Sequence, residues 1–292
     1  MKKALIIGST GLLGSRLSKL LSNQYELTCT HHKNSPLPGF NSINVAITSM
    51  SELERLFSIN YFDVVINCAG LTNVEACESR PEAAWQLNAT LPYHLAILSK
   101  KYNSRLIHIS TDHFFSEYEG PRDETEFMVP VNQYGYSKLA GEKYVLNFND
   151  SATVIRTNFF GLSTPGSHSL LNFLVSNLSR NENITGFEDV HFSPLGVSIL
   201  ALLVSEIAKC EIPGLINVAG SETVSKYDFA CLVATALGSP KTLVHPGSVS
   251  ILGGSVARPS YLALDNTKLV STLKFQLPSI KSMIEAELQN AI

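Results

Sequence analysis

The sequence predicts an α/β protein with a doubly wound parallel sheet and a smaller, partly interleaved C-terminal domain. Over the first 156 residues, short segments that are apolar throughout alternate with segments whose apolar residues recur at helical spacing. Strands that are apolar throughout are buried on both faces, which is typical of a parallel sheet covered by helices on both sides. A glycine-rich turn also joins the first strand to the first helix. We therefore expect ligands at the carboxyl ends of the strands.

Each element of the first region follows from its local pattern. Ser49 and Glu52 have the spacing of a capping box and begin a helix that runs to residue 59. Pro81 stands near the start of a longer helix. The predicted strands are residues 3–7, 26–30, 63–67, 105–109 and 153–156. The predicted helices are residues 12–21, 49–59, 81–99 and 133–148.

After residue 156 the alternation of strands and helices changes. Residues 169–180, 197–209 and 226–237 have helical patterns, 215–218 resembles one more buried strand, and Pro and Gly become frequent between 240 and 259. We expect residues 1–156 to form a first domain, to which a segment near 195–220 returns. Residues 157–292 are then mainly a substrate or lid domain. Residues 111–132 form a long loop without a regular pattern, and such loops are usually functional or mobile.

The composition excludes several classes of protein. The chain has 292 residues, 45% of them hydrophobic, and a net charge of only −3, which disfavours both disorder and a nucleic-acid partner. No apolar run reaches the ~18 residues of a membrane-spanning helix, so we expect no membrane partner. The five cysteines include no C-x-x-C pair, which favours reduced thiols in a cytoplasmic protein. No His, Cys or Asp cluster has metal-ligand spacing, so we expect no metal.

The glycine-rich turn has the pattern of a dinucleotide-binding, Rossmann-like site. Gly8 permits a tight turn, Gly11 lets the backbone approach a pyrophosphate, and Gly14 lets the helix pack closely on the sheet. The free N–H groups at the helix start attract phosphate. The alternative is a turn that is only structural. The cofactor-binding candidates of this turn are Gly8, Thr10, Gly11, Leu12, Leu13 and Gly14.

The end of the second strand bears on the choice of nicotinamide cofactor. An acidic residue about 20 residues after the glycines would bind the ribose 2′-hydroxyl of NAD. Here the chain reads Thr28-Cys29-Thr30-His31-His32-Lys33, without a carboxylate. Lys33, with His31 or His32, could hold a 2′-phosphate instead, which favours NADPH. If these are only solvated loop residues, NADH is possible.

Tyr134 and Lys138 are candidates for proton transfer. They lie four residues apart and therefore share one face of the predicted helix, whereas Tyr136 points to another face. A free phenol titrates near about 10, and a neighbouring ammonium favours the phenolate, so its pKa moves towards the working range of an acid catalyst. The alternative is an ordinary surface pair. The position of the pair, after the long loop, favours the functional interpretation.

These features together resemble the extended short-chain dehydrogenase/reductase family. The resemblance rests on four patterns: Gly8-x-x-Gly11-x-x-Gly14, Asn67-x-Ala69-Gly70, Ser110-Thr111-Asp112 and Tyr134-x-x-x-Lys138. Within this family, residues 71–78, 110–114 and 134–142 are similar to the dTDP-4-dehydrorhamnose reductases. The same holds for Arg258-Pro259 and the run 264–269. The resemblance extends over nearly the whole chain.

The resemblance implies a role for each matching residue. Tyr134 would donate a proton to a ketone oxygen that Thr111 binds, while Lys138 would hold the nicotinamide ribose. Ala69, Gly70 and Leu71 would lie beside the cofactor. Arg258 would grip a nucleotide diphosphate in bidentate fashion, or it would be a structural Arg paired with an acid. The implied substrate-binding candidates are Thr111, Asp112, Phe159 and Arg258.

The implied function is NAD(P)H-dependent reduction of a nucleotide-activated 4-keto-6-deoxy sugar, as in dTDP-rhamnose biosynthesis. The family's 4,6-dehydratases have a second acid after Thr-Asp, where this chain has His113, a residue better interpreted as packed or in a loop than as an acid. Residues 46–48 and 156–161 depart from the reductase pattern, so the identity of the sugar stays open. The alternatives are a 4-epimerase and a non-catalytic NADP-binding regulator similar to the regulatory subunit of methionine adenosyltransferase. The resemblance to this family also suggests a homodimer.

Overall fold

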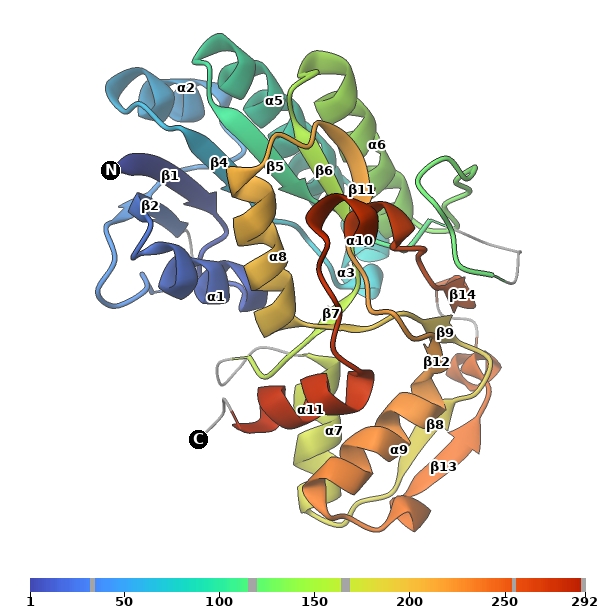
Figure 1. Ribbon diagram of the computed structural model, residues 1–292. Coiled ribbons are helices and arrows are strands. Elements are labelled where there is room, and N and C mark those ends of the chain that lie inside the picture. The colour runs from blue at the N-terminus through green and yellow to red at the C-terminus, as the bar shows by residue number, and fades with distance from the viewer. Residues whose placement is uncertain (32–34, 115–119, 164–168, 254–255, 290–292) are drawn as a thin grey trace. The chain divides into compact units, whose positions relative to one another are not determined.

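The computed structural model describes residues 1–31, 35–114, 120–163, 169–253 and 256–289 (Figure 1). The chain divides into two compact units. Unit 1 comprises Met1–Thr111, Pro130–Arg156 and Ala201–Ile216, and unit 2 comprises Asp112–Val129, Thr157–Leu200 and Asn217–Ile292. Neither unit is a continuous piece of chain, because the backbone passes repeatedly from one to the other.

Unit 1 is built on a seven-stranded sheet with the strand order β11-β6-β5-β4-β1-β2-β3. The hydrogen-bonded pairs from β3 to β6 are all parallel. The chain thus moves outward from β1 first in one direction and then in the other. Ligands of doubly wound sheets bind at such a reversal point, here beyond the carboxyl ends of β1 and β4. The strands are β1 (Lys2–Ile7), β2 (Tyr25–His31), β3 (Ser42–Asn44), β4 (Val64–Asn67), β5 (Arg105–Ile109), β6 (Thr153–Arg156) and β11 (Gly214–Asn217).

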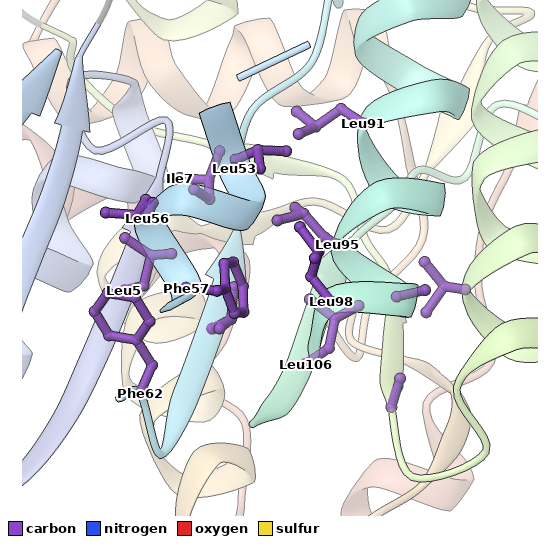
Figure 2. Close-up of a cluster of buried hydrophobic side chains, with 14 of the residues drawn as sticks. Leu5, Ile7, Leu53, Leu56, Phe57, Phe62, Leu91, Leu95, Leu98 and Leu106 are labelled. Carbon is purple, nitrogen blue, oxygen red and sulfur yellow. The ribbon is translucent and has the colours of Figure 1, made fainter. Parts of the chain in front are cut away.

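Helices cover both faces of this sheet, so the predicted fold class is confirmed (Figure 1). On one face lie α2 (Met50–Ile59), α5 (Leu91–Lys101) and α6 (Gln133–Phe148), and on the other lie α1 (Leu12–Leu21) and α8 (Val197–Lys209). Figure 2 shows the core beneath α2 and α5, where Leu53, Phe57 and Leu95 are almost completely buried. Truncating one such side chain to Ala typically costs about 2–5 kcal/mol.

Several elements of unit 1 differ from the sequence prediction. The predicted helix 81–99 exists as α4 (Pro81–Trp85), a π-helical turn η1 (Gln86–Thr90) and α5. The short edge strand β3 and the six-residue helix α3 (Val74–Ser79) were not predicted. Both are too short for hydrophobic periodicity to reveal them. Asn73 nevertheless caps α3, since its side chain accepts a hydrogen bond from the amide of Ala76.

Unit 2 combines helices with small sheets. The strands pair as β10-β7, β12-β9-β14 and β13-β8. Phe160, Phe192 and Phe229 pack edge to face at its centre, with ring centroids 5.0 and 5.4 Å apart. The strands are β7 (Phe159–Phe160), β8 (Ile184–Phe187), β9 (His191–Phe192), β10 (Leu195–Gly196), β12 (Val224–Ser225), β13 (Val244–Gly247) and β14 (Tyr261–Leu262). The helices are α7 (Leu170–Ser179), the start of α8, α9 (Lys226–Leu237), the 3-10 turns η2 (Lys241–Leu243) and η3 (Val249–Leu252), α10 (Thr267–Leu273) and α11 (Ile280–Gln289).

The long loop after Thr111 is anchored within unit 2 where the structure describes it. Arg122 forms a parallel bridge with Leu264, and its amide donates to the carbonyl of Ala263 at 3.0 Å. The Glu124 carboxylate accepts a hydrogen bond from the amide of Asn217 at 2.8 Å. The part of the loop around Arg122 and Glu124 is therefore held by long-range hydrogen bonds of both backbone and side chain.

Among the residues that the structure describes, no helix is both long enough and apolar enough to cross a bilayer.

Candidate active site

The glycine turn brings the ends of β1 and β4 into close contact. Gly8 has φ +79°, a conformation that side chains with a Cβ rarely adopt, and a Cβ there would lie 2.8 Å from the amide nitrogen of Ala69. A Cβ on Gly14 would lie 2.2 Å from the Gly8 carbonyl oxygen. Gly14 therefore lets α1 pack against the turn itself, whereas the sequence suggested that it packs on the sheet.

Helix α1 begins without a side-chain cap. Its N-cap residue is Gly11, and no side chain accepts a hydrogen bond from its first amides. By contrast, Ser49, Asn132 and Ser225 cap α2, α6 and α9 with their side chains. The first N–H groups of α1 therefore keep their donor capacity for a ligand. Together with the close glycine turn, this start fits a dinucleotide pyrophosphate.

Polar side chains tie the glycine turn to the end of β2. The Ser9 hydroxyl donates to the carbonyl of Thr30 at 2.8 Å, and the amide of Gly8 donates to the Thr30 hydroxyl at 3.3 Å. His31 follows at the carboxyl end of β2 and is half-buried. Its Nδ1 is buried without a partner among the described residues. Lys33, the other candidate for a 2′-phosphate, lies outside the described residues.

Two buried side chains shape the segment Ala69–Leu71 that follows β4. The Asn67 amide group contacts Nδ1 of His108 at 3.1 Å and accepts from the amide of Ala69 at 3.1 Å. Asn88 holds Leu71 from the other side. It accepts from the Leu71 amide at 2.8 Å and donates to the Leu71 carbonyl at 2.9 Å. The three cofactor candidates Ala69, Gly70 and Leu71 therefore lie in a segment with fixed ends.

Asn88 also connects this segment to α6. Its side chain is fully buried and donates to the Ser137 hydroxyl at 3.1 Å. The residue stands in the π-helical turn, and such turns occur frequently at functional sites. Asn88 is therefore a buried residue and not one on the exposed surface of the helix.

Tyr134 and Lys138 lie on the buried face of α6. Tyr134 is 8% exposed and Lys138 4%, whereas Tyr136 is 51% exposed, as the helical spacing predicts. The Lys138 ammonium donates to the carbonyl of Ile109 at 2.7 Å, which ties α6 to the end of β5. Thr111, two residues after Ile109, is also buried. All three candidate catalytic residues therefore belong to unit 1, at the carboxyl end of β5 and on the adjoining helix.

Burial dominates the electrostatics around Lys138. It lowers the pKa of Lys138 to about 8, although the carboxylate of Glu142 acts in the opposite direction. Burial and the charge of Lys138 lower the pKa of His108 well below its ordinary value, so its imidazole is neutral at pH 7. Burial also raises the pKa of Cys68 to about 12, so that thiol stays protonated. At pH 7, Lys138 is therefore charged, whereas His108 and Cys68 are neutral.

One turn beyond Lys138, Glu142 forms a buried ion pair. Its carboxylate accepts from Nε and Nη2 of Arg156, at distances between 2.9 and 3.2 Å. Both side chains are at most 1% exposed. The pair joins α6 to the last residue of β6 and thereby fixes the helix that carries Tyr134 and Lys138.

Unit 2 holds the remaining substrate candidates. The Asp112 carboxylate is buried and accepts a hydrogen bond from the Asn158 side chain at 2.5 Å. Phe159 is half-buried at the start of β7, whose register pairs it with Leu195. Asp112 follows Thr111 directly in the chain.

Two cationic side chains of the same unit act on His113. Burial, and then the charges of Arg258 and Lys226, lower the pKa of His113 to about 4. The imidazole is therefore neutral at pH 7 and is no substitute for the second acid of a dehydratase. Arg258, the candidate for a diphosphate, is half-buried, and its charge and that of Lys226 both act on His113.

Comparison with known proteins agrees with this arrangement. A family model described as the RmlD substrate binding domain matches residues 1–292, the whole chain. The chain belongs to the RmlD substrate-binding-domain family. The resemblance to extended short-chain dehydrogenases/reductases is thereby confirmed.

The RmlD-family relatives of this chain include reductases and a subunit of another enzyme. A probable low-salt glycan biosynthesis reductase, Agl14 of Haloferax volcanii, is 29% identical over 97% of this chain and 96% of that protein. A dTDP-4-dehydrorhamnose reductase of Mycobacterium tuberculosis is 30% identical over 91% of this chain and 85% of that protein. The methionine adenosyltransferase 2 subunit beta of Xenopus laevis is 28% identical over 92% of this chain and 81% of that protein.

Solved RmlD-like structures share the fold along the whole chain. A dTDP-4-dehydrorhamnose reductase of Bacillus anthracis in complex with NADP superimposes with a TM-score of 0.89, at 24% identity, over 99% of this chain and 100% of that chain. A hypothetical dTDP-4-dehydrorhamnose reductase of Sulfolobus tokodaii is 28% identical with a TM-score of 0.86, over 96% of this chain and 98% of that chain.

Sequence reasoning missed some polar residues of this RmlD-family site. His108 stands inside an apolar strand, and its polarity there was a signal that could have drawn attention to it. Lys226 and Asn158 belong to no recognised pattern. Long-range packing brings them to Asp112, and no local signal in the sequence announces such contacts.

Proposed function

We propose that this RmlD-family protein is an NADPH-dependent reductase of a nucleotide-activated 4-keto-6-deoxy sugar. The observation that carries the proposal is the buried face of α6, where Tyr134 and Lys138 lie one turn apart beside the end of β5. A surface Tyr–Lys pair would leave both side chains solvated. Here a low-dielectric environment surrounds both groups, and protein groups placed in such an environment exert strong electrostatic effects on a reaction.

The residues of unit 1 would divide the chemistry among them. A bound nicotinamide cofactor supplies the hydride for the carbonyl carbon of the sugar. The Thr111 hydroxyl binds the carbonyl oxygen, and the Tyr134 phenol donates a proton to it. The Lys138 ammonium donates one N–H to the carbonyl of Ile109, and its other two N–H groups would bind ribose hydroxyls. Its positive charge stabilises the phenolate that Tyr134 becomes after proton donation.

The described residues fit such a cofactor. The uncapped start of α1 and the Gly8–Gly14 turn would hold the pyrophosphate, and Ala69–Leu71 would lie along it. The end of β2 carries no carboxylate for a 2′-hydroxyl of NAD. The relative from Bacillus anthracis that binds NADP also supports NADPH as the first cofactor to test. His31 and Lys33 remain the candidates for the 2′-phosphate.

A spectrophotometric assay tests the proposal. The protein is mixed with NADPH, and in a second run with NADH, and absorbance loss is followed after addition of dTDP-4-keto-6-deoxy-mannose. We expect loss with the wild type, and a rate at least about 100-fold lower in Tyr134→Phe, because the proton donor is gone. Tyr136→Phe is the matched control, since Tyr136 is exposed two residues away, and it should keep full activity. Full activity of Tyr134→Phe would contradict the mechanism.

A non-catalytic regulator is the second candidate function. The relatedness to methionine adenosyltransferase 2 subunit beta over 92% of the chain supports it. Tight NADPH binding without turnover of any nucleotide sugar would favour this candidate. A 4-epimerase, in contrast, would interconvert sugars without net loss of NADPH.

The proposal extends to the cellular compartment and the oligomeric state of the protein. All five cysteines are free thiols, and Cys29 and Cys77 are buried, which supports a reducing compartment such as the cytoplasm. The homodimer suggested by family habit is tested by light scattering of the purified protein, where the mass of two chains is expected.

A further inference from the structure

Two polar side chains face each other inside the large sheet, near the carboxyl ends of β4 and β5. Asn67 and His108 lie opposite each other in the register of these parallel strands, and both are fully buried. Nδ2 of Asn67 lies 3.1 Å from Nδ1 of His108. The proposed chemistry assigns no role to His108.

The contact with Ala69 fixes which way the Asn67 side chain points. Oδ1 of Asn67 accepts a hydrogen bond from the amide of Ala69 at 3.1 Å, so its NH2 group faces His108. An NH2 group donates and does not accept, so Nδ1 of His108 is the acceptor and the ring proton is on Nε2. A proton on Nδ1 would set two donors against each other. The pair therefore requires a neutral imidazole in one tautomer.

Packing alone does not account for a histidine at this position. Nε2 of His108 is buried and has no hydrogen-bond partner among the residues that the structure describes. An unpaired buried donor destabilises a fold, and an apolar side chain would avoid that loss. Burial, and then the charge of Lys138, lower the pKa of His108 well below its ordinary value, which keeps the ring neutral. What the ring supplies is the acceptor at Nδ1.

This acceptor bears on one end of the segment Ala69–Leu71. Asn88 holds the far end, through the amide and the carbonyl of Leu71. At the near end, the amide of Ala69 donates to Asn67. Ala69 also lies against the glycine turn, since a Cβ on Gly8 would come within 2.8 Å of its amide nitrogen. Rotation of the Asn67 side chain would release Ala69 at the point where the segment meets that turn.

We propose that His108 is a positioning residue for the cofactor segment Ala69–Leu71, and that it acts through Asn67. His108 fixes the orientation of the Asn67 side chain, and Asn67 in turn fixes the amide of Ala69 before a cofactor binds. A segment that is already ordered loses less conformational entropy on binding, so the affinity rises. That the ligand of this segment is NADPH rests on the proposed function.

A matched pair of substitutions tests the role of Nδ1. The side chain of Asn carries its amide at the level of Nδ1, whereas that of Gln carries it at the level of Nε2. We expect His108→Gln to weaken NADPH binding at least about tenfold, measured by fluorescence titration of the full-length protein without any sugar. His108→Asn should recover most of the affinity. Equal NADPH affinity of His108→Gln and wild type overturns the proposal, even if the reductase assay succeeds.

A double-mutant cycle tests whether His108 acts through Asn67. Asn67→Ala should weaken NADPH binding, and the addition of His108→Gln should change it by no more than about twofold. Two losses that multiply would overturn the proposal. Ile107→Val changes a buried neighbour on the same strand and controls for stability, because it should lower the thermal midpoint and leave NADPH affinity unchanged.

NMR of the wild-type protein with ¹⁵N-labelled histidine tests the tautomer without a cofactor. Correlations to the backbone assign the ring of His108, and at pH 7 we expect an unprotonated Nδ1 and a protonated Nε2. A proton on Nδ1 overturns the proposal, also where the variants fail to fold.

The outcomes separate the positioning role from the proposed function. NADPH binding that depends on His108 as expected, without turnover of any nucleotide sugar, supports the positioning role and speaks against the reductase. A wild type that binds neither NADPH nor NADH contradicts both.

Discussion

Burial lowers the pKa of Lys138 from 10.5 to about 8, and only part of that effect is offset by Glu142. Between these two pH values the unfolded chain holds a proton that the native chain lacks. The free energy of unfolding therefore rises with pH between pH 8 and pH 10.5. Below pH 8 the burial of the charged lysine lowers it by about 3 kcal/mol. The residue that the proposed chemistry needs thus destabilises the fold at neutral pH.

We predict that Lys138→Met raises the thermal midpoint at pH 7. The variant also loses the hydrogen bond to Ile109, which costs about 1 kcal/mol. We therefore expect the free energy of unfolding at pH 7 to rise by about 1–2 kcal/mol. The gain should shrink as the pH rises and approach zero or reverse above pH 10.5, where the wild-type lysine becomes neutral in both states. Thermal unfolding at both pH values measures this. Lys143→Met, an exposed position on the same helix, should show no such pH dependence. A midpoint difference between Lys138→Met and wild type that is the same at both pH values contradicts the argument.

At the scale of elements, the π-helical turn η1 determines what its neighbours can do. The extra residue of such a turn lets Asn88 point at the segment after β4 and at α6 together. A regular helix from Pro81 to Lys101 would present a different set of side chains to these neighbours. The turn therefore couples the cofactor segment to the catalytic helix.

We predict that Asn88→Ala lowers the free energy of unfolding by about 2–4 kcal/mol, because the amide of Leu71 loses its partner, the carbonyl of Leu71 keeps only the thiol of Cys77, and the buried hydroxyl of Ser137 loses a donor. NADPH affinity should fall with it, since Leu71 belongs to the cofactor segment. Urea unfolding and NADPH titration measure the two effects. Gln86→Ala, an exposed position in the same turn, serves as the control and should change neither. An Asn88→Ala protein with wild-type stability would show that the turn does not depend on this side chain.

The contact of α6 with β6 depends on a buried charge pair. We predict that Glu142→Gln destabilises the protein by about 3–5 kcal/mol, because the Arg156 guanidinium loses its countercharge inside the core. The double variant Glu142→Leu with Arg156→Met should lose less than the single one, as it buries no lone charge. Guanidinium unfolding checks this. Glu54→Gln breaks a surface pair with Lys101 and is expected to change little.

At the scale of the whole molecule, the two units share elements. Helix α8 begins in unit 2 and ends in unit 1, and β11 passes from unit 1 into unit 2 at Asn217. We predict a single cooperative transition in calorimetric unfolding, because neither unit can lose its structure without disturbing an element of the other. NADPH at about 100 times its Kd should stabilise the native state by about 2.7 kcal/mol and shift the entire transition. Two separate transitions, with only one shifted by NADPH, would contradict this view.

The parts predicted from sequence are those with strong local signals. The buried strands such as 63–67 show as apolar runs, and the glycine turn and the Tyr134–Lys138 spacing are visible within a few residues. The two-residue strands of unit 2 and helices α10 and α11 were not predicted, because tertiary pairing and packing, rather than periodicity, stabilise them. The contact of Lys226 with Phe192 likewise joins residues far apart in the chain.

The return of β11 to the edge of β6 has a practical consequence for anyone who wants the first unit alone. The amide of Gly214 donates to the carbonyl of Ala152, and the Thr153 hydroxyl donates to the carbonyl of Ile212, so residues 212–214 cover the outer side of β6. A fragment that ends at Arg156 would present β6 as an open edge strand. Open edges pair with other chains, so such a fragment is expected to aggregate on expression. A usable fragment needs residues 201–216 supplied through a linker or as a separate peptide.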